Sequence, residues 1–472
     1  MQNKNKRIKD FFKLDVSNDK LQLFEELEEF LDSGVQTFVL TGYAGTGKTT
    51  VMKALGDYLS YKKRHFKMMA STGRAAKILR DKTKYDASTI HLGIYRFELS
   101  KNKDGYIHLV FKVVINFENK DKVYIIDEAS MISNRPANPS YATFGSGKLL
   151  DDIYTYLGGR KVIFIGDLGQ LPPVNSDISP ALNPIYLQKH YQTKVQNFNL
   201  SVIHRRDHKS ALYKLSKHFL DIFDTGTYNK KLDIDVDRTA GDIRFISYEY
   251  DLINKYCSGY TENVQPDSII LTLSNKKVHS LNLYVRNELY SDFSHLHKNE
   301  WFINYSNNYK FNILNGDNIK LIELTGEPEH RAGLTFQPAL WEFEYMNKKI
   351  QIKAFVILEY LISNIPALNI EAEKNLVIDF NIRMHKKEIK PSNKIEYMQA
   401  LKTDPYLNAL RLRYGHALTV HKAQGGEWNK VFLVFENYFG NYFKPKYQHN
   451  WAYTAFTRAR KVLFIQNNPY IK

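Results

Sequence analysis

The stretch that decides the fold is "LTGYAGTGKTTVMKAL", from residue 40 to residue 55. It fits the pattern G-x-x-x-x-G-K-[ST], with Gly42, Gly47, Lys48 and Thr49 at the fixed positions. The preceding "TFVL" predicts a buried strand, and the residues after Lys48 have helical spacing. A strand, a glycine-rich turn and a helix together direct backbone N–H groups at an anion. We therefore expect a phosphate-binding loop in which Lys48 reaches the β- and γ-phosphates and Thr49 holds Mg²⁺.

Two further apolar runs end in polar residues. "KVYIIDEAS" (122–130) predicts a strand that ends at Asp127 and Glu128, and "KVIFIGDLGQLPPV" (161–174) predicts a strand followed by Gln170. Ligands bind at the carboxyl ends of the strands of an open α/β sheet. In P-loop ATPases the first acid holds Mg²⁺ and the second polarises the attacking water. We expect Asp127 as a metal ligand, Glu128 as the catalytic base and Gln170 at the γ-phosphate.

The composition points to a basic protein of several domains. The chain has 472 residues, enough for about two to four domains. Its net charge of +16 favours a polyanionic partner, and its 14% aromatic content supplies rings for base stacking. The single cysteine, Cys257, excludes an intrachain disulfide and a multi-cysteine zinc site and suits a reducing compartment. No apolar run approaches ~18 residues, and the N-terminus lacks a signal-peptide core, so we expect a cytoplasmic protein without a membrane partner.

Phosphoryl transfer also needs positive charge near the phosphates. "LSVIHRRD" (200–207) contains Arg205 and Arg206, and "WAYTAFTRARK" (451–461) contains Arg458 and Arg460. All four are distant from Lys48 in the sequence. Taken alone, each pair is more simply explained as surface charge.

The motifs together resemble those of superfamily 1B DNA helicases, in the RecD/Dda-like branch. They occur in the family's order over residues 40–460, which is nearly the whole chain. The stretches that carry the resemblance are "GYAGTGKTT", "STGRAAKIL", "ASTIH", "IIDEAS", "GDLGQLPPV", "HRR", "TVHKAQGGEW" and "AYTAFTRAR". The resemblance implies an ATP-dependent helicase that moves 5′ to 3′ on single-stranded DNA and uses ATP and Mg²⁺.

The resemblance also implies roles for single residues. Arg205 and Arg458 look like arginines that reach the nucleotide from the second domain, and Gln170 looks like a γ-phosphate contact. The implied nucleotide-binding residues are Gly42, Gly45, Thr46, Gly47, Lys48, Thr49, Thr50 and, near the sugar, Glu427. The implied contacts to single-stranded DNA are Ser71, Thr72, Gly73, Arg74, Thr89 and His91, and the implied residues that couple DNA to ATP are Thr419, His421, Lys422 and Gln424.

One position departs from the family pattern. Members often have a glutamine upstream of the first helix that reads adenine. With Phe24 placed on the family's apolar position, Lys20 falls where that glutamine is expected, and Gln22 lies two residues on. We expect ATP as the nucleotide, with loose selectivity for adenine.

The fold class that we expect is α/β, with two RecA-like P-loop domains. The first covers residues 1–94 and 123–197, and the second covers 198–290 and 409–472. Within the second, Asn275 follows the strand-like "SIILTLS" and is a further candidate for contact with nucleic acid. Residues 291–408 contain strand-like pieces and the turn signal Asn315-Gly316, and we expect a mostly β insert, which is a small SH3-like barrel in the family.

A second insert is expected at residues 95–122. Two alternating apolar runs in "YRFELSKNKDGYIHLVFKV" (95–113) flank Asp104-Gly105, a hairpin turn signal. The family has a small wedge domain at this position. The hairpin is therefore either a wedge at the DNA fork, involving Phe97, Asp104 and Gly105, or a surface ribbon without a role in unwinding.

The function that we expect is ATP-driven unwinding of DNA by a monomer, with single-stranded and forked DNA as partners. A single-stranded-DNA-binding protein or replication proteins are further candidate partners in a bacterial or phage-infected cytoplasm. Two alternatives remain open: a translocase that displaces proteins without unwinding, and an ATP-gated clamp without catalysis. "TVHKAQGGEW" argues against a small-molecule kinase. Sequence alone leaves the pathway open.

Overall fold

The computed structural model describes most of the chain. The described residues are 6–14, 16–101, 107–136, 142–203, 209–234, 241–261, 266–290, 295–345, 348–362, 370–436 and 438–471. Three residues with an expected role, Asp104, Gly105 and Arg205, lie outside these ranges. Within the described ranges, no helix has both the length and the apolar character that a membrane span requires.

The first lobe is a parallel six-stranded sheet in the order β3-β2-β6-β8-β1-β9. The strands are β1 (Thr37–Gly42), β2 (Phe66–Ala70), β3 (Ala87–Thr89), β6 (Val123–Asp127), β8 (Val162–Gly166) and β9 (Val195–Leu200). The helices around it are η1 (Ile8–Phe11), α1 (Asn18–Asp32), α2 (Lys48–Tyr61), α3 (Gly73–Thr83), α4 (Ile90–Ile94), η2 (Ala129–Met131), α5 (Leu149–Leu157), η3 (Pro180–Leu182) and α6 (Pro184–Tyr191).

Both faces of this sheet are covered, as expected for parallel strands that are apolar throughout. In β1, Phe38 and Leu40 pack with residues of α1 and α2, whereas Val39 packs with residues of α5 and α6. The carboxyl ends of β1, β6 and β8 therefore lie at one edge of the sheet. The first lobe continues to the end of β9 at Leu200, beyond the expected boundary at residue 197.

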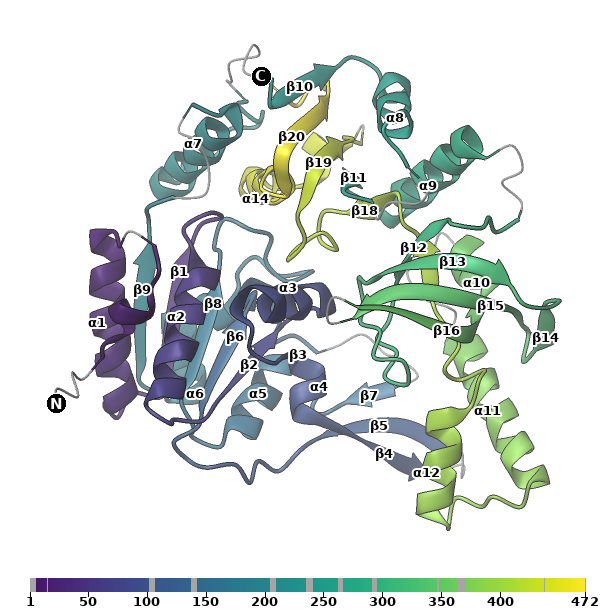
Figure 1. Ribbon diagram of the computed structural model, residues 1–472. Helices are drawn as coiled ribbons and strands as arrows, with labels where there is room; N and C mark the ends of the chain where they lie inside the picture. Colours follow the sequence, from purple (N-terminus) through teal and green to yellow (C-terminus); the bar gives the residue numbers. More distant parts are fainter. Residues whose placement is uncertain are drawn as a thin grey trace.

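The second lobe is a parallel five-stranded sheet in the order β10-β20-β19-β11-β18. Its strands are β10 (Ile243–Ile246), β11 (Ser268–Thr272), β18 (Ala417–Thr419), β19 (Trp428–Leu433) and β20 (Ala459–Gln466). Its helices are α7 (Ala211–Thr225), α8 (Glu249–Cys257), α9 (Asn275–Leu289), α13 (Phe439–Tyr442) and α14 (Pro445–Phe456). The two parallel sheets confirm the α/β class, and Figure 1 shows them facing each other.

A third unit lies between α9 and β18 in the sequence and carries an antiparallel sheet, as expected. Its strands are β12 (Trp301–Asn304), β13 (Asn318–Leu324), β14 (Glu329–Arg331), β15 (Leu334–Tyr345), β16 (Lys348–Ile357) and β17 (Leu412–Tyr414). Three helices follow β16, namely α10 (Leu358–Ile362), α11 (Ile370–Lys386) and α12 (Lys394–Thr403). The sequence analysis did not foresee these helices. Leu376, Phe380 and Met384, spaced four residues apart and buried, mark the inner face of α11.

The hairpin in the first lobe consists of β4 (Tyr95–Lys101) and β5 (Ile107–Val113). We expected a two-stranded ribbon, but a third strand, β7 (Ala142–Phe144), pairs with β5 in parallel. The rings of Phe111 and Phe144 stack with their centroids 4.4 Å apart, and Phe97 packs on Phe111. The extra strand and this aromatic stack give the base of the hairpin the packing that a lone ribbon lacks.

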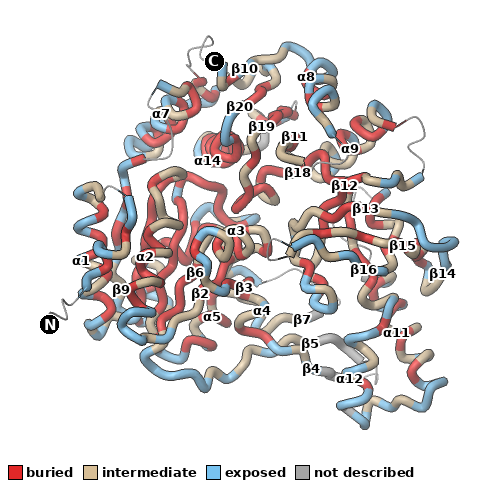
Figure 2. The backbone as a smooth tube through the Cα atoms, viewed as in Figure 1, coloured by how far each residue is buried: buried red, intermediate tan, exposed pale blue. Residues whose placement is uncertain are grey.

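The buried backbone follows the two parallel sheets and the antiparallel sheet (Figure 2). By contrast, α11 and α12 and the β4–β5 hairpin project from the body on the same side of the molecule (Figure 1). Neither projection is part of the two parallel sheets that form the lobes.

Candidate nucleotide site and nucleic-acid contacts

The loop between β1 and α2 has the backbone of a phosphate cradle. Gly45 and Gly47 have φ angles of +89° and +91°, which side chains other than glycine rarely adopt. A Cβ atom on Gly42 would lie 2.9 Å from the Cβ atom of Leu200, so the close approach of β9 also requires glycine there. The loop leads directly into α2, which begins at Lys48, and its N–H groups are thus available to an anion.

The Lys48 ammonium lies inside the loop. Its Nζ atom donates to the carbonyl oxygens of Gly42 and Tyr43 at 2.6 and 2.9 Å. These acceptors are neutral, so a phosphate entering the loop offers Lys48 a stronger hydrogen-bond partner. Thr46 is fully buried and donates to the Tyr43 carbonyl at 2.9 Å, which fixes the shape of the loop.

Two adjacent carboxyl groups face the loop from the end of β6. Glu128 has φ +51°, a left-handed conformation uncommon for a residue with a side chain, and Ser71 donates to its carbonyl at 2.7 Å. Enclosure between the lobes and the neighbouring Asp127 raise the pKa of Glu128 to about 7, against the lowering effect of Arg458 and Lys48. Enclosure also raises the pKa of Asp127. Two crowded acids of this kind suit a site that takes up positive charge.

The donor set fits Mg²⁺. Asp127 is a hard oxygen ligand whose pKa is raised by burial, against the lowering effect of Lys48 and Lys82, and Thr49 lines the same cavity. Mg²⁺ is usually bound by one or two protein oxygens together with substrate phosphates. In the described part of the chain no cluster of three or more His, Cys, Asp or Glu residues could hold a metal by itself. The two residues thus match a metal that arrives with a nucleotide.

The end of β8 contributes Gln170 and a buried Asp167. The Gln170 amide lines the cavity, and its Oε1 atom is buried without a hydrogen-bond partner among the described residues. Asp167 accepts from Tyr453 of α14 at 3.1 Å, and the Tyr453 hydroxyl in turn accepts from the Ala44 N–H at 2.8 Å. One tyrosine of the second lobe therefore joins two segments of the first lobe beside the phosphate loop.

The cavity between the lobes has a volume of about 550 Å³. The first lobe contributes most of its lining, and the second contributes Gly425, Glu427 and Arg458. Arg458 is only 4% exposed, and its guanidinium donates to the carbonyls of Thr454 and Gly426 at 2.9 and 3.1 Å. It also donates to the Thr457 hydroxyl at 3.0 Å. Since all three acceptors are neutral, its charge acts on Glu128 and is available to an anion in the cavity.

Phe12, Leu14 and Lys20 also line the cavity. Lys20 is 2% exposed, and burial lowers its pKa. Its Nζ atom donates to Ser17 at 3.2 Å and lies 5.8 Å from the centre of the Phe12 ring. An apolar wall with one cationic donor suits the edge of a planar base.

The structure brings several expected DNA contacts together at the junction of the second lobe and the insert. A small pocket there is lined by Asn275, Thr419 and Lys422, together with Tyr305 and Arg413. Lys422 lies over the ring of Tyr305, and burial together with Arg413 lowers its pKa to about 7. A partly desolvated cation beside an aromatic ring is well suited to a phosphate and a stacked base.

The other expected DNA contacts engage in protein contacts. Thr72 and Thr89 cap the N-termini of α3 and α4 by accepting from Ala75 and Leu92. Ser71 donates to the Glu128 carbonyl, and His91 packs against Tyr95 and Phe144. His421 faces the Tyr447 hydroxyl at 3.3 Å, and burial lowers its pKa to about 4. Their roles toward DNA stay predictions.

Gly73, Arg74 and Gln424 form contacts between parts of the molecule. Arg74 stacks on Trp428 of the second lobe, with 4.7 Å from the guanidinium to the ring centre, and donates to the Gly316 carbonyl of the insert at 2.7 Å. A Cβ atom on Gly73 would lie 2.4 Å from Leu314, so the insert approaches α3 closely. Gln424 donates to the Leu171 carbonyl of the first lobe at 2.9 Å.

Sequence reasoning missed Tyr453 and Lys82. Lys82 lines the cavity and lowers the pKa of Asp127. The charged stretch "LRDKTK" around it is typical of a solvent-exposed helix end, so the sequence did not indicate this role. Tyr453 lies in "AYTAFTRAR", where we assigned a role only to the arginines. Asn450 lies three residues before it, the spacing of one helix face, and this polar position in an otherwise apolar stretch is the signal that could have indicated Tyr453.

The raised pKa of Glu128 yields a test of the site without substrate. Because its folded-state pKa exceeds the unfolded one, the folded protein retains a proton and loses stability as the pH rises toward about 7. Glu128→Gln removes this titration. We expect the difference in melting temperature, Glu128→Gln minus parent, to be more positive at pH 8 than at pH 5. Both proteins are measured without nucleotide or metal. Glu323→Gln, at an exposed position, is the control. An equal difference at both pH values would contradict the enclosed carboxyl pair.

Comparison with known proteins agrees with this geometry. Residues 24–221 match the family model of an AAA domain, and residues 414–465 match that of a UvrD-like helicase C-terminal domain. The ATP-dependent RecD2 DNA helicase of Deinococcus radiodurans is 24% identical over 94% of this chain and 48% of its own length. The RecBCD enzyme subunit RecD of Buchnera aphidicola is 26% identical over 90% of this chain and 69% of its own length.

Among solved structures, the Pif1 helicase from Bacteroides in complex with ADP-AlF3 and single-stranded DNA matches with a TM-score of 0.46. It is 15% identical, over 94% of this chain and 91% of that one. The chain spans less than half the length of two curated relatives that it matches, at 38% and 48%. The two domain models, in this order on one chain, and the matches to RecD2 and RecD show that the chain is similar to superfamily 1B helicases of the RecD type.

Proposed function

We propose that the protein is an ATP-dependent DNA helicase that moves 5′ to 3′ on single-stranded DNA. The observation that carries the proposal is the cavity between the lobes. Lys48, Glu128 and Gln170 line it from the first lobe, and Arg458 lines it from the second. A nucleotide bound there contacts both lobes, so its binding and hydrolysis change the free energy of their contact.

The chain's own residues account for the hydrolytic step. Lys48 and Arg458 offer positive charge to the phosphates from opposite sides, and Glu128 is positioned to accept a proton from the attacking water. Thr49 and Asp127 would hold Mg²⁺, which supplies further neutralisation of the phosphate charge when it is bound. The unpartnered amide oxygen of Gln170 is available to orient the water or to sense the γ-phosphate.

A single segment supports coupling between nucleotide and DNA. Residues 419–427 begin at the pocket that holds Thr419 and Lys422, and they end at the cavity wall with Gly425 and Glu427. Between these ends, Gln424 is hydrogen-bonded to the first lobe. A movement of one lobe relative to the other therefore displaces the predicted DNA contacts and the nucleotide contacts together, through one short segment. If the two lobes bind the DNA strand tightly in alternation, each such movement shifts the protein along the strand.

Further details of the proposal come from the resemblance. The overall length and the short insertions look most like those of phage Dda helicase within the family, and the 5′ to 3′ polarity also comes from the resemblance. We propose forked and single-stranded DNA as substrates, a monomer as the active form and cytoplasmic function in a bacterial or phage-infected cell. A single-stranded-DNA-binding protein or a replication protein is the partner class that we propose.

The decisive experiment measures ATP hydrolysis with and without single-stranded DNA, followed by unwinding of duplexes with a 5′ or a 3′ tail. We expect DNA to stimulate hydrolysis and only the 5′-tailed duplex to unwind. Lys48→Ala, which removes the phosphate-reaching charge, is the inactive control. Parent-like hydrolysis by Lys48→Ala, within about threefold, amounts to under ~1 kcal/mol of barrier and would exclude the loop as the catalytic site. A protein that binds DNA but hydrolyses no ATP would be the clamp.

A variant of the β4–β5 hairpin distinguishes a helicase from a translocase that does not unwind DNA. Replacing residues 100–107 with a short Gly-Ser link leaves the aromatic base of Phe97, Phe111 and Phe144 and every cavity residue in place. We expect DNA-stimulated ATP hydrolysis near the parental rate and a sharp fall in duplex unwound per ATP. Base stacking is worth ~1–3 kcal/mol, enough for one ring to bias an opening fork. Parental unwinding by the trimmed protein would place strand separation elsewhere.

Lys20 is predicted to weaken selection for adenine. A lysine only donates hydrogen bonds, so it matches the O6 and N7 acceptors of guanine but not the N6 donor of adenine. Glutamine both donates and accepts. We expect Lys20→Gln to raise the ratio of ATP to GTP affinity by up to about tenfold, the value of one hydrogen bond, in titrations with fluorescent nucleotides. Lys13→Gln, at a nearby exposed position, should leave the ratio unchanged. An unchanged ratio in Lys20→Gln would remove Lys20 from the base site.

A further inference from the structure

The turn between α11 and α12 displays a cluster of cationic side chains. Residues 385–394, "HKKEIKPSNK", contain four lysines and one glutamate. His385, Lys386, Lys387 and Lys390 are all exposed. In the described part of the chain, none of these three lysines forms an ion pair, whereas Arg383, one turn earlier, pairs with two carboxylates. These three lysines therefore present positive charge that no carboxylate among the described residues pairs with.

The backbone of this turn is well ordered by local contacts. Phe380, Met384 and Tyr397 pack together between the two helices, and all three are buried. The Ile389 N–H donates to the Met384 carbonyl at 3.0 Å, and Glu388 adopts φ +60°. With the apolar side chains directed inward by this packing, the lysines project into solvent from a fixed turn. We call residues 385–394 the basic tip.

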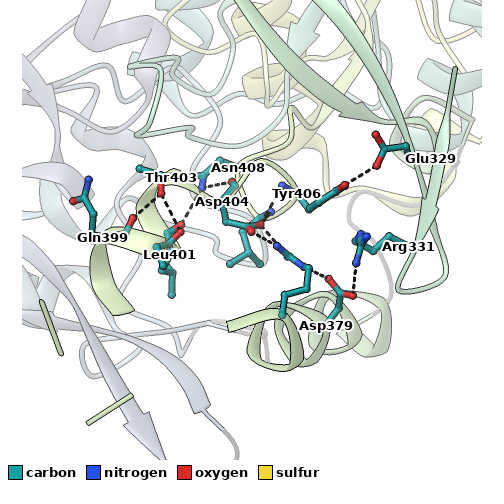
Figure 3. Close-up of polar contacts among 12 residues, drawn as sticks. Glu329, Arg331, Asp379, Gln399, Leu401, Thr403, Asp404, Tyr406 and Asn408 are labelled. Carbon is teal, nitrogen blue, oxygen red and sulfur yellow. Dashed lines mark hydrogen bonds and ion pairs between the residues drawn. The ribbon is translucent and has the colours of Figure 1, made fainter. Parts of the chain in front are cut away.

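An ionic network fixes α11 to the edge of the antiparallel sheet. Asp379 of α11 accepts from Arg331 of β14 at 3.0 Å and from Arg383 at 2.8 Å (Figure 3 labels Asp379 and Arg331). Arg383 also forms a bidentate ion pair with Asp404, which follows α12. The network thus joins β14, α11 and the end of α12, and a bidentate arginine constrains orientation as well as distance.

Tyr406 completes the attachment. Its hydroxyl donates to Glu329 of β14 at 2.6 Å (Figure 3). The guanidinium groups of Arg331 and Arg383 lie 4.6 and 4.9 Å from the centre of its ring. A flexibly attached cluster of charges would bind an anion in any orientation. Because ion pairs and a stacked ring fix the orientation of the basic tip relative to the sheet, the tip can bind an extended anion in one direction.

We propose that the basic tip binds the phosphate backbone of duplex DNA, and this rests on the proposed function in taking DNA as the polyanion. The expected contacts to the single strand lie elsewhere, at the pocket with Thr419 and Lys422. The two helices project on the same side as the β4–β5 hairpin (Figure 1), where a duplex about to be opened would lie. Lysines without a planar fork or an adjacent stacking ring suit phosphates rather than base edges.

This assignment has a quantitative consequence. Each phosphate that a lysine neutralises releases counterions and adds about 0.9 to the slope of log affinity against log salt on B-DNA. Removal of three lysine charges should lower that slope by about 2 to 3. The contacts carry no base code, so duplexes of different sequence should respond alike.

The test uses the full chain with Lys386→Gln, Lys387→Gln and Lys390→Gln combined. Binding to a blunt duplex of about 20 base pairs and to a single strand of the same length is measured over a range of salt, without nucleotide. We expect duplex affinity to fall by about tenfold or more at low salt with the slope change above, while single-strand affinity and DNA-stimulated ATP hydrolysis stay near parental.

The matched control combines Lys214→Gln, Lys217→Gln and Lys230→Gln. These lysines are exposed on and after α7, at the opposite corner of the molecule, and their loss changes the net charge equally (Figure 1). The control should leave duplex affinity close to parental.

Equal losses of duplex affinity in both triple variants would mean that only net charge matters. An equal loss of single-strand affinity by the tip variant would assign the tip to binding of the single strand. Either result overturns the proposal, as does parental duplex binding. If the parent shows no DNA-stimulated ATP hydrolysis, the proposed function fails instead, independently of the duplex measurement.

Discussion

The docking of α14 against the loop after β8 is the contact on which the arrangement of this protein depends. Asn450 donates to the Gly169 carbonyl at 2.8 Å, and Thr454 accepts from the Leu171 N–H at 2.9 Å. A Cβ atom on Gly169 would lie 2.9 Å from the Tyr453 ring, so the helix approaches the loop as closely as glycine permits. The same helix ends beside Arg458. The contact that joins the lobes therefore also sets the distance between Arg458 and the phosphate loop.

A concentration of buried charge is the second feature of the cavity. Lys48 and Arg458 donate only to neutral oxygens there, and Asp127 and Glu128 lie side by side with raised pKa values. Neither arrangement is favourable alone, since buried charges are stable mainly when they are paired. A nucleotide with its metal supplies both kinds of partner at once. The free protein is thereby organised for a ligand that carries negative phosphates and positive metal together.

Spacing along the chain was enough to predict which segments of the first lobe lie together at one edge of its sheet. Strands that end at Gly42, Asp127 and Gly166 lie in one parallel sheet, and a parallel sheet brings its carboxyl ends to one edge. The contribution of Arg458 followed from family resemblance, because no local pattern distinguishes it from the exposed Arg460. The polar helix face that includes Tyr453 could be seen in the sequence, but its hydrogen bond to Asp167 could not be predicted, since it joins residues 286 positions apart. The same holds for β7, whose parallel pairing with β5 depends on tertiary packing of Phe144 on Phe111 rather than on local propensity.

The central claim is that the second lobe completes the catalytic site through Arg458, and steady-state ATP hydrolysis by Arg458→Ala tests it most directly. Arg460→Ala is the comparison, because Arg460 lies two residues on, is exposed and pairs with Asp267 at 3.0 Å. Melting temperatures and fluorescent-nucleotide affinities establish that both variants fold and bind. The account predicts that Arg458→Ala lowers turnover by about 10³, the scale of a charge that stabilises the transferred phosphoryl group, while Arg460→Ala stays near parental. Parental turnover by a folded Arg458→Ala protein would contradict the account.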